Sequence, residues 1–402
     1  MSNSRIIAWC VWVIVSIFYA YQYVLRVIPN AMFEDIMQQF HMDAASFGQF
    51  AGVYYIGYNI MPIPIAIMLD RYGPRRIMTC CILLTVIGLF PIIFAENWIY
   101  PVIGRLMIGT GSAAAILGIF KIVRMTFSEK HFTRMLSISV TIGLIGAIYG
   151  GGPVSSMCSS FGYKTVIEIF IASGLILAAA TYFIVPNMES SDRGTVMADI
   201  KVIFTNKKVM LLCCFAGFMV GPLEGFADVW GSEFLKQVYG FDQSLASSTP
   251  SIIFMGMCFG APILGMIAEK TGNYMGCIVA SGILMLITFT TLVAGVLTIS
   301  TMTISFAIVG VCCAYQILAI YKATTFVPES VTALTTAVAN MIIMSFGYAF
   351  HTVIGYVVSI YGGTTAPEAF IYGVGVIPVA LVIGVTGFIM LWYNENTKAK
   401  NA

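Results

Sequence analysis

The chain has 402 residues, of which 59% are hydrophobic and 9% are charged, and its mean hydropathy is +0.92. Soluble globular domains carry about 25% charged residues, so this composition excludes a soluble globule and predicts a membrane protein. The formal net charge of +2 gives no support for nucleic-acid binding.

Hydrophobic stretches of about 20 residues, the length that crosses a bilayer as a helix, recur along the whole chain. We therefore expect an all-α membrane protein with twelve transmembrane helices in two six-helix bundles. The predicted helices cover residues 6–28, 44–68, 77–95, 98–120, 135–158, 163–185, 208–232, 244–267, 274–297, 300–321, 332–358 and 369–393.

The basic residues predict the orientation, because Lys and Arg are retained on the cytoplasmic side of membranes. Most of the twenty lysines and arginines fall on one side of the predicted helices, and both termini are then cytoplasmic. The predicted domains are an N-terminal bundle (1–186), a cytoplasmic linker (187–207) and a C-terminal bundle (208–402). We expect the first segment to be retained, since it lacks a small-residue cleavage site.

A turn with an acid, a base and a glycine follows the second predicted helix and recurs after the eighth. The first copy reads Asp70-Arg71-x-Gly73-x-Arg75-Arg76, and the second contains Glu269 and Lys270. Such a half-length repeat is typical of transporters built from two related bundles. Opposite charges at these helix ends predict a latch that closes the cytoplasmic side; the alternative is that the arginines only fix the topology.

Arg105 and Glu224 lie far from the ends of their predicted helices. An arginine or an acid at a helix centre costs about 2.5–3.5 kcal/mol on insertion scales, which makes both residues candidates for a functional site. Arg26, Asp228 and His351 lie nearer the outer boundary, where a role as rim residues is the alternative.

The seventh predicted helix contains Pro222 and glycines at Gly217, Gly221 and Gly225. Proline removes a backbone donor, so we expect a local break beside Glu224. Irregular backbone at membrane depth can line a water-filled cavity, although the glycines would also permit close helix packing.

Polar and aromatic side chains complete the candidate site. Tyr58, Tyr315, Gln316 and Asn340 fall near mid-depth, where no lipid headgroup can satisfy them. Tyr23 shares one face of the first predicted helix with Arg26, but a tyrosine near an outer helix end can equally be an interfacial anchor.

The sequence carries ten cysteines in mainly apolar segments, without C-x-x-C spacing, and we interpret them as small core residues. It has no phosphate-binding glycine loop, zinc spacing or nucleophile elbow. We expect neither an enzyme nor a bound metal or cofactor.

The turn at Asp70 resembles the loop between helices two and three of the major facilitator superfamily, although Ala66 replaces its leading glycine. Arg105-x-x-x-Gly109-x-Gly111 is similar to the fourth-helix motif of that superfamily, and residues 143–153 are similar to its glycine-rich fifth helix. The resemblance implies the fold and the transport activity of that superfamily.

A second resemblance is to the Pht-type intraphagosomal nutrient transporters of proteobacteria. It is carried by F-Y-x-Y-x-Y-V-L-R-V-I-P-N (18–30), Y-Y-I-G-Y-N-I-M-P-I-P (54–64), F-A-D-V-W-G-S-E-F-L (226–235) and Ala339-Asn340-Met341. It implies uptake of amino acids and related small metabolites across a bacterial inner membrane.

The sequence therefore predicts a monomeric secondary transporter of a small polar metabolite, working in the lipid bilayer by alternating access, with the proton as coupling ion. Arg105 would hold a substrate carboxylate, and Glu224 or Asp228 the amine. Glu224, Asp228 and His351 are candidate proton carriers. The alternatives are an exporter of amphipathic compounds, a facilitated-diffusion uniporter or a non-transporting nutrient sensor.

Overall fold

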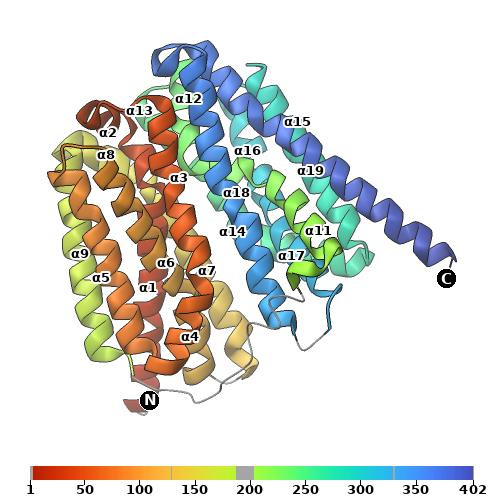
Figure 1. Ribbon diagram of the computed structural model, residues 1–402, viewed down its shortest axis with the longest axis horizontal. Coiled ribbons are helices and arrows are strands. Elements are labelled where there is room, and N and C mark those ends of the chain that lie inside the picture. Colours follow the sequence, from red (N-terminus) through yellow and green to blue (C-terminus); the bar gives the residue numbers. More distant parts are fainter. Residues whose placement is uncertain (1–2, 128, 187–202, 329–330, 402) are drawn as a thin grey trace. The chain divides into compact units, whose positions relative to one another are not determined.

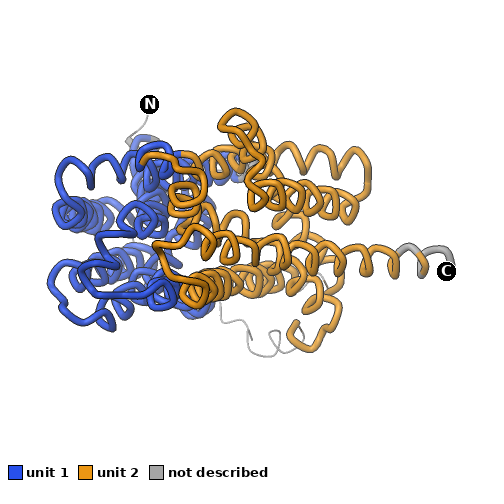
Figure 2. Tube along the Cα trace, turned by 90° about the horizontal axis from the view of Figure 1, so that it is seen from above, with its two compact units in different colours: residues 1–193, 243–248 blue, residues 194–242, 249–402 orange. Residues whose placement is uncertain are grey.

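The computed structural model describes residues 3–127, 129–186, 203–328 and 331–401 (Figure 1). Helices make up most of this part of the chain, and it contains no strand. Most of the predicted linker, residues 187–202, lies outside it. The chain divides into two compact units, coloured in Figure 2: unit 1 has residues 1–193 and 243–248, and unit 2 has residues 194–242 and 249–402.

Unit 1 is built from helices that pack along one another, with close pairs between α5 and α6, α1 and α7, and α3 and α6. Its elements are α1 (Asn3–Ala31), α2 (Phe33–Phe40), α3 (Ala44–Ile60), α4 (Pro62–Tyr72), α5 (Pro74–Phe94), α6 (Ile99–Thr126), α7 (Glu129–Gly150), α8 (Gly152–Phe161), α9 (Tyr163–Ile184) and the short α13 (Gln243–Ser248).

Unit 2 is also helical, with close packing between α14 and α16 and between α15 and α19. Its elements are α11 (Lys207–Phe218), η1 (Gly221–Trp230), α12 (Gly231–Tyr239), α14 (Ser251–Thr271), α15 (Tyr274–Val293), α16 (Ile299–Cys313), α17 (Tyr315–Thr324), α18 (Thr332–Ile360), η3 (Gly363–Thr365) and α19 (Pro367–Asn401).

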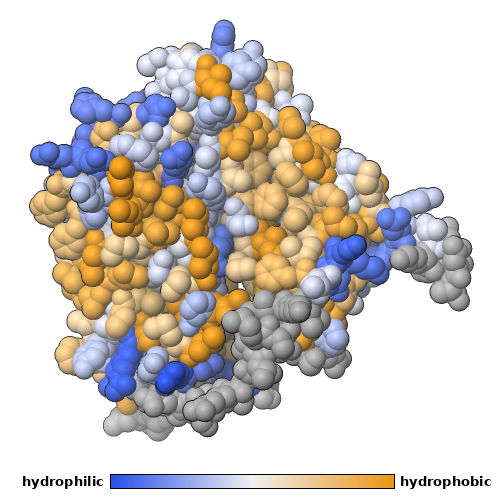
Figure 3. Space-filling model, viewed as in Figure 1, coloured by the Kyte–Doolittle hydropathy of each residue, from blue (hydrophilic) through white to orange (hydrophobic). Residues whose placement is uncertain are grey.

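The helices are long and apolar enough for a multi-pass membrane protein. Ten continuous spans meet the length and hydropathy expected of membrane helices, or up to twelve when each of two bent pairs counts as one span. On the face drawn in Figure 3, hydrophobic side chains cover much of the length of the helices, and hydrophilic ones gather mainly near their ends. The predicted all-α membrane fold is confirmed.

Two of the predicted helices are bent, and small or imino residues explain both bends. The pair α3 and α4 bends by 48° at Met61, directly before Pro62, and the pair α7 and α8 bends by 40° at Gly151. Pro62 and Pro64 bring no N–H to the carbonyls of residues 58 and 60, four positions earlier. The first bend therefore follows from the P-I-P sequence.

The predicted break in the seventh helix takes the form of a π-helical segment. The helix α11 ends at Phe218, and η1 then runs for ten residues, all of them buried, before α12 continues. A side-chain carbon added to Gly221 would lie 2.8 Å from the Phe350 ring of α18, and one added to Gly225 3.2 Å from Phe350 Cβ. Segments of π-helix are rare and often occur at functional sites.

Candidate functional site

Arg105 lies on α6 in the interior of unit 1 and is 1% exposed. Its Nη1 donates to the carbonyl of Leu25 in α1 at 2.6 Å. Its Nη2 donates to the carbonyl of Arg26 at 3.2 Å and, more weakly, to that of Ala51 in α3 at 3.5 Å. One guanidinium therefore links α6 to the backbones of two other helices, α1 and α3.

Pro29 explains why the Leu25 carbonyl takes a side-chain donor. In a regular helix the N–H of residue 29 would donate to the carbonyl of residue 25, and proline has no N–H. An arginine at the centre of a membrane helix costs about 2.5–3.5 kcal/mol on insertion scales, whereas each hydrogen bond to a charged group contributes about 1.5–3 kcal/mol. These contacts favour a role for Arg105 in holding α1, rather than the expected contact with a substrate carboxylate.

Arg26 is the second buried cation of unit 1, at 7% exposure, so it is not an exposed rim residue. Its guanidinium carbon lies 5.3 Å from the ring centroids of both Tyr23 and Tyr55. Ring faces attract a cation. The predicted neighbours Tyr23 and Arg26 do meet, and Tyr55 joins them from α3.

Tyr54 contacts two further residues of the predicted site, Tyr58 and Arg105. Its ring stacks on that of Tyr58, with centroids 5.8 Å apart at 17°, and the Arg105 guanidinium carbon lies 5.1 Å from the Tyr54 centroid. The Tyr54 hydroxyl donates to Gln22 Oε1 at 2.7 Å. Helical spacing places Tyr54 and Tyr58 on one face of α3, but only the fold brings Gln22 to them.

Asn59 is a buried polar residue that sequence reasoning missed. It is 5% exposed, and neither Oδ1 nor Nδ2 has a hydrogen-bond partner in the part of the chain described. An amide inside an apolar helix, three residues before the P-I-P sequence, is a signal that could have found it.

The first copy of the repeated turn contains an ion pair. Lys121 Nζ, near the end of α6, donates to Asp70 Oδ1 at 2.7 Å and to the Leu69 carbonyl at 2.7 Å. Gly73 ends α4 with a φ of 79°, a conformation that favours glycine, and its N–H also donates to Leu69. The pair borders a cavity of about 550 Å³, lined by Ala66, Leu69, Asp70, Leu117, Phe120, Lys121, Arg124, Met125 and Phe132.

The arginines of the turn have other neighbours. Arg75 Nε donates to the Val185 carbonyl, just beyond the end of α9, at 2.7 Å. The Arg71 guanidinium lies 5.3 Å from the ring of Tyr72, and Arg76 is exposed. Within unit 1 the basic partner shown for Asp70 is thus Lys121, which the sequence pattern did not single out.

The second copy keeps the turn but shows no such pair. Gly272 ends α14 with a φ of 64°, as Gly73 ends α4 with a positive φ. Glu269 and Lys270 are exposed, and within the described ranges they form no ion pair.

Unit 2 contains the buried acids. Glu224 and Asp228 lie on η1 with 1% and 0% exposure, and His351 on α18 has 1%. The contacts of Phe350 with Gly221 and Gly225 show that α18 packs directly on η1. Asp228 and His351 are therefore core residues of this unit and not rim residues.

The remaining candidates of unit 2 have different surroundings. The Tyr315 hydroxyl donates to the Ala216 carbonyl at 2.6 Å, near the end of α11, where that carbonyl also accepts from Met219 N–H. Gln316 is 6% exposed, and its Nε2 has no partner among the described residues. Asn340 is half-buried on α18.

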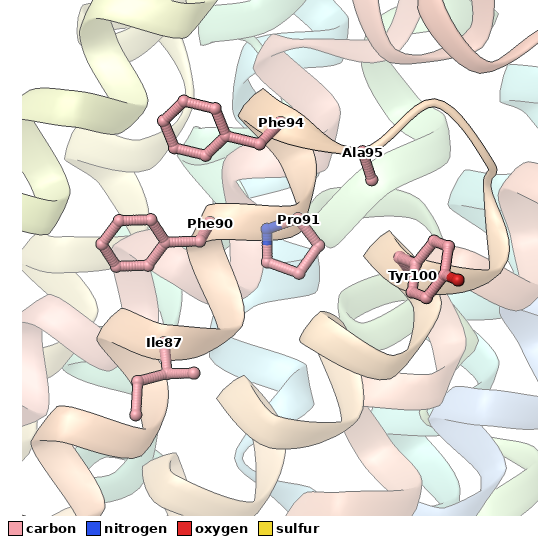
Figure 4. Close-up of a pocket in the computed structure, with 6 residues that line it drawn as sticks. All are labelled: Ile87, Phe90, Pro91, Phe94, Ala95 and Tyr100. Carbon is pink, nitrogen blue, oxygen red and sulfur yellow. The ribbon is translucent and has the colours of Figure 1, made fainter.

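A shallow hollow of about 360 Å³ lies where α5 ends and α6 begins (Figure 4). It is lined by Ile87, Phe90, Pro91, Phe94, Ala95 and Tyr100. The lining has no charged side chain and the rings of Phe90 and Phe94 are exposed, so it does not suit a small polar ligand.

Metal ligands are not clustered. Among the described residues, no group of three His, Cys, Asp or Glu side chains could hold a metal ion. The ten cysteines are free.

Comparison with known proteins shows the family. A family model described as the Major Facilitator Superfamily matches residues 11–352. The nitrite extrusion protein of Bacillus subtilis (strain 168) is 19% identical over 257 residues, and the uncharacterized transporter YybO of the same organism is 22% identical over 279 residues. The chain spans 62% of the length of each of these relatives.

Solved structures show the same fold. A bacterial homolog of the human lysosomal transporter Spinster, in an inward-facing and unoccupied conformation, matches with a TM-score of 0.77 and 16% identity over 97% of both chains. The nucleoside transporter NupG matches with a TM-score of 0.75 and 16% identity, over 95% of this chain and 99% of that one. At this identity the likeness concerns the fold alone.

Proposed function

Because the chain belongs to the major facilitator superfamily, we propose that it is a proton-coupled importer of a small polar metabolite, such as an amino acid, in a bacterial inner membrane. Both termini then lie in the cytoplasm, as the basic residues indicate, and the protein works as a monomer by alternating access. The observation that carries this proposal is a buried cation, Arg26, held between tyrosine rings inside an apolar bundle.

The buried guanidinium of Arg26 supports a substrate that carries an acidic group. A guanidinium binds a carboxylate at two points, and Arg26 is a buried guanidinium beside the rings of Tyr23 and Tyr55. Tyr23 and Tyr58 are half-buried and would contact the substrate beside it. Arg105 then acts through α1, whose carbonyls it holds next to Arg26.

Buried titratable residues of unit 2 support the coupling of transport to protons. Glu224 and Asp228 are buried acids on a π-helical segment, and a buried acid on the transport path is a candidate proton carrier. His351 is the third candidate, because histidine ordinarily titrates near neutral pH. Gln316 and Asn340 supply further polar groups.

The repeated turn supports gating. Asp70 and Lys121 form an ion pair at one end of unit 1, and Arg71, Arg75 and Arg76 surround the same turn. We assign the cytoplasmic gate to this turn, and a weaker counterpart to the turn with Glu269 and Lys270.

A buried arginine also suits a small inorganic anion, which is the second candidate substrate class. One relative is named a nitrite extrusion protein, and its name indicates export rather than uptake. Nitrite and nitrate therefore belong in the substrate panel.

Uptake into proteoliposomes tests the proposal. The panel holds labelled zwitterionic amino acids, matched monocarboxylates without the amine, nucleosides, nitrite and nitrate, each with and without an inward proton gradient. We expect accumulation of an amino acid that needs the gradient. Uptake without accumulation would indicate facilitated diffusion, and transport of a panel of amphipathic compounds alone would indicate the exporter.

A further inference from the structure

A buried amide side chain, Asn59, lies in the last turn of α3, next to the break between α3 and α4. Both side-chain atoms of the buried Asn59 are without a partner in the described part of the chain. Buried polar groups normally find partners, so the Asn59 amide is a candidate to bind a ligand.

The position of Asn59 connects it to the arginine site. Asn59 follows Tyr55 by four residues, so it lies on the same face of α3, about 6 Å further along the helix. The Tyr55 ring lies 5.3 Å from the guanidinium carbon of Arg26. The unpartnered amide thus lies about one helical turn along α3 from a ring that contacts the cation that we assign to the acidic end of the substrate.

We infer that Asn59 binds the hydrogen-bond-donating end of the substrate, an ammonium or an amide. This inference rests on the proposed function, because it concerns the same site. The amide oxygen is an acceptor, which suits a group with N–H donors. Both ends of a zwitterion then bind within unit 1, and Glu224 and Asp228 remain for the proton.

A packing role for Asn59 makes the opposite prediction about stability. Leucine has the same branched side-chain shape, with two methyl groups in place of the amide, so Asn59→Leu removes a buried amide without leaving another polar group unpaired. If the amide serves only the substrate, this variant is at least as stable as wild type and defective in binding. Such a trade between stability and activity is typical of binding sites.

The test compares wild type and Asn59→Leu as full-length proteins in detergent and in proteoliposomes. The ligands are the transported amino acid and the matched monocarboxylate that lacks the amine. We expect the melting temperature without ligand to equal or exceed that of wild type. Apparent affinity for the amino acid should fall at least tenfold, and affinity for the monocarboxylate less than twofold.

Thr181→Val is the matched control, because it also removes a buried and unpartnered polar atom, on α9. We expect wild-type uptake from it. If Asn59→Leu does not fold, Asn59→Ala serves in the same comparison.

Three results would overturn the inference. Wild-type affinity of the variant for the amino acid would do so and leave the proposed function intact. A lower melting temperature with equal losses for both ligands would show a packing role. A wild-type protein that neither binds nor transports any panel member would reject the proposed function and the inference together.

Discussion

Arg105 Nη1 lies 2.6 Å from the carbonyl oxygen of Leu25, the carbonyl whose helical donor is removed by Pro29. A side chain of α6 thus replaces a backbone hydrogen bond of α1. The Tyr315 hydroxyl makes a related contact in unit 2, to the Ala216 carbonyl shortly before η1. In both units a side chain of one helix donates a hydrogen bond to a backbone carbonyl near an irregularity in another helix.

The first prediction is that Pro29→Ala rescues a variant of Arg105. Arg105→Gln removes the charge and two of the carbonyl contacts, and we expect substrate affinity to fall at least tenfold because α1 and Arg26 shift. In Pro29→Ala/Arg105→Gln, the restored N–H can donate to Leu25, so part of the affinity should return. Binding to the three purified variants measures this.

Direct substrate binding by Arg105 gives a different result in the same experiment. The double variant would then be as defective as Arg105→Gln, because no N–H in α1 replaces a lost ligand. Pro29→Ala alone is the control, and we expect it to bind substrate close to the wild-type level.

The second prediction concerns the ion pair of the gate. Asp70 is exposed, with 58% of its side chain accessible, and exposed ion pairs contribute about 0–1 kcal/mol to stability. Asp70→Asn should therefore leave the melting temperature nearly unchanged and slow net transport severalfold, with substrate affinity retained. Glu269→Gln is the control in the second turn and should have a smaller effect.

Exchanging the charges gives a sharper version of this experiment. Asp70→Lys/Lys121→Asp restores the attraction between the two positions, so it should transport faster than either single variant. A double variant that transports as slowly as the slower single variant would argue against the ion pair as the interaction that controls the gate.

The sequence predicted the membrane helices because their signal is local. A run of apolar residues as long as the bilayer is thick indicates a membrane helix without reference to any other part of the chain. The short α2 was not predicted, since its buried residues Phe33, Ile36 and Phe40 make an amphipathic pattern of only eight residues. The bend at Met61 was also missed, although Pro62 and Pro64 signalled it.

The site was less predictable because its contacts join distant parts of the chain. The depth of Arg105 followed from counting residues, but its acceptors depend on Pro29 in another helix. The pairing of Asp70 with Lys121 spans 51 positions, and no local pattern selects that lysine over its neighbours. Sequence reasoning therefore found the charged residues of unit 1 better than their partners.

The third prediction separates the two neighbours Tyr315 and Gln316. Tyr315→Phe removes one hydrogen bond to Ala216, which contributes about 0.5–1.5 kcal/mol, so the melting temperature should fall slightly with little change in affinity. Gln316→Leu should instead lower the affinity for the substrate and leave the melting temperature nearly unchanged. A loss of affinity in Tyr315→Phe at unchanged stability would instead place its hydroxyl on the substrate, as the sequence first indicated.

The last prediction concerns coupling, and it begins from the burial of Glu224 on η1. If Glu224 is protonated and deprotonated during each cycle, Glu224→Gln can no longer carry a proton, since an amide does not titrate. We expect this variant to lose accumulation driven by a proton gradient. It should retain exchange of labelled for unlabelled substrate, because exchange needs no net movement of protons.

Glu233→Gln is the matched control for Glu224→Gln, since Glu233 is also a buried acid of unit 2, with its Oε1 accepting from Gln237 Nε2 at 2.7 Å. We expect it to keep accumulation. If Glu224→Gln still accumulates substrate against its gradient, Glu224 is not the carrier, and Asp228→Asn and His351→Gln are the next variants to measure. If Glu224→Gln loses both exchange and accumulation, Glu224 instead holds the substrate. The assignment of the substrate amine to Asn59 argues against that result.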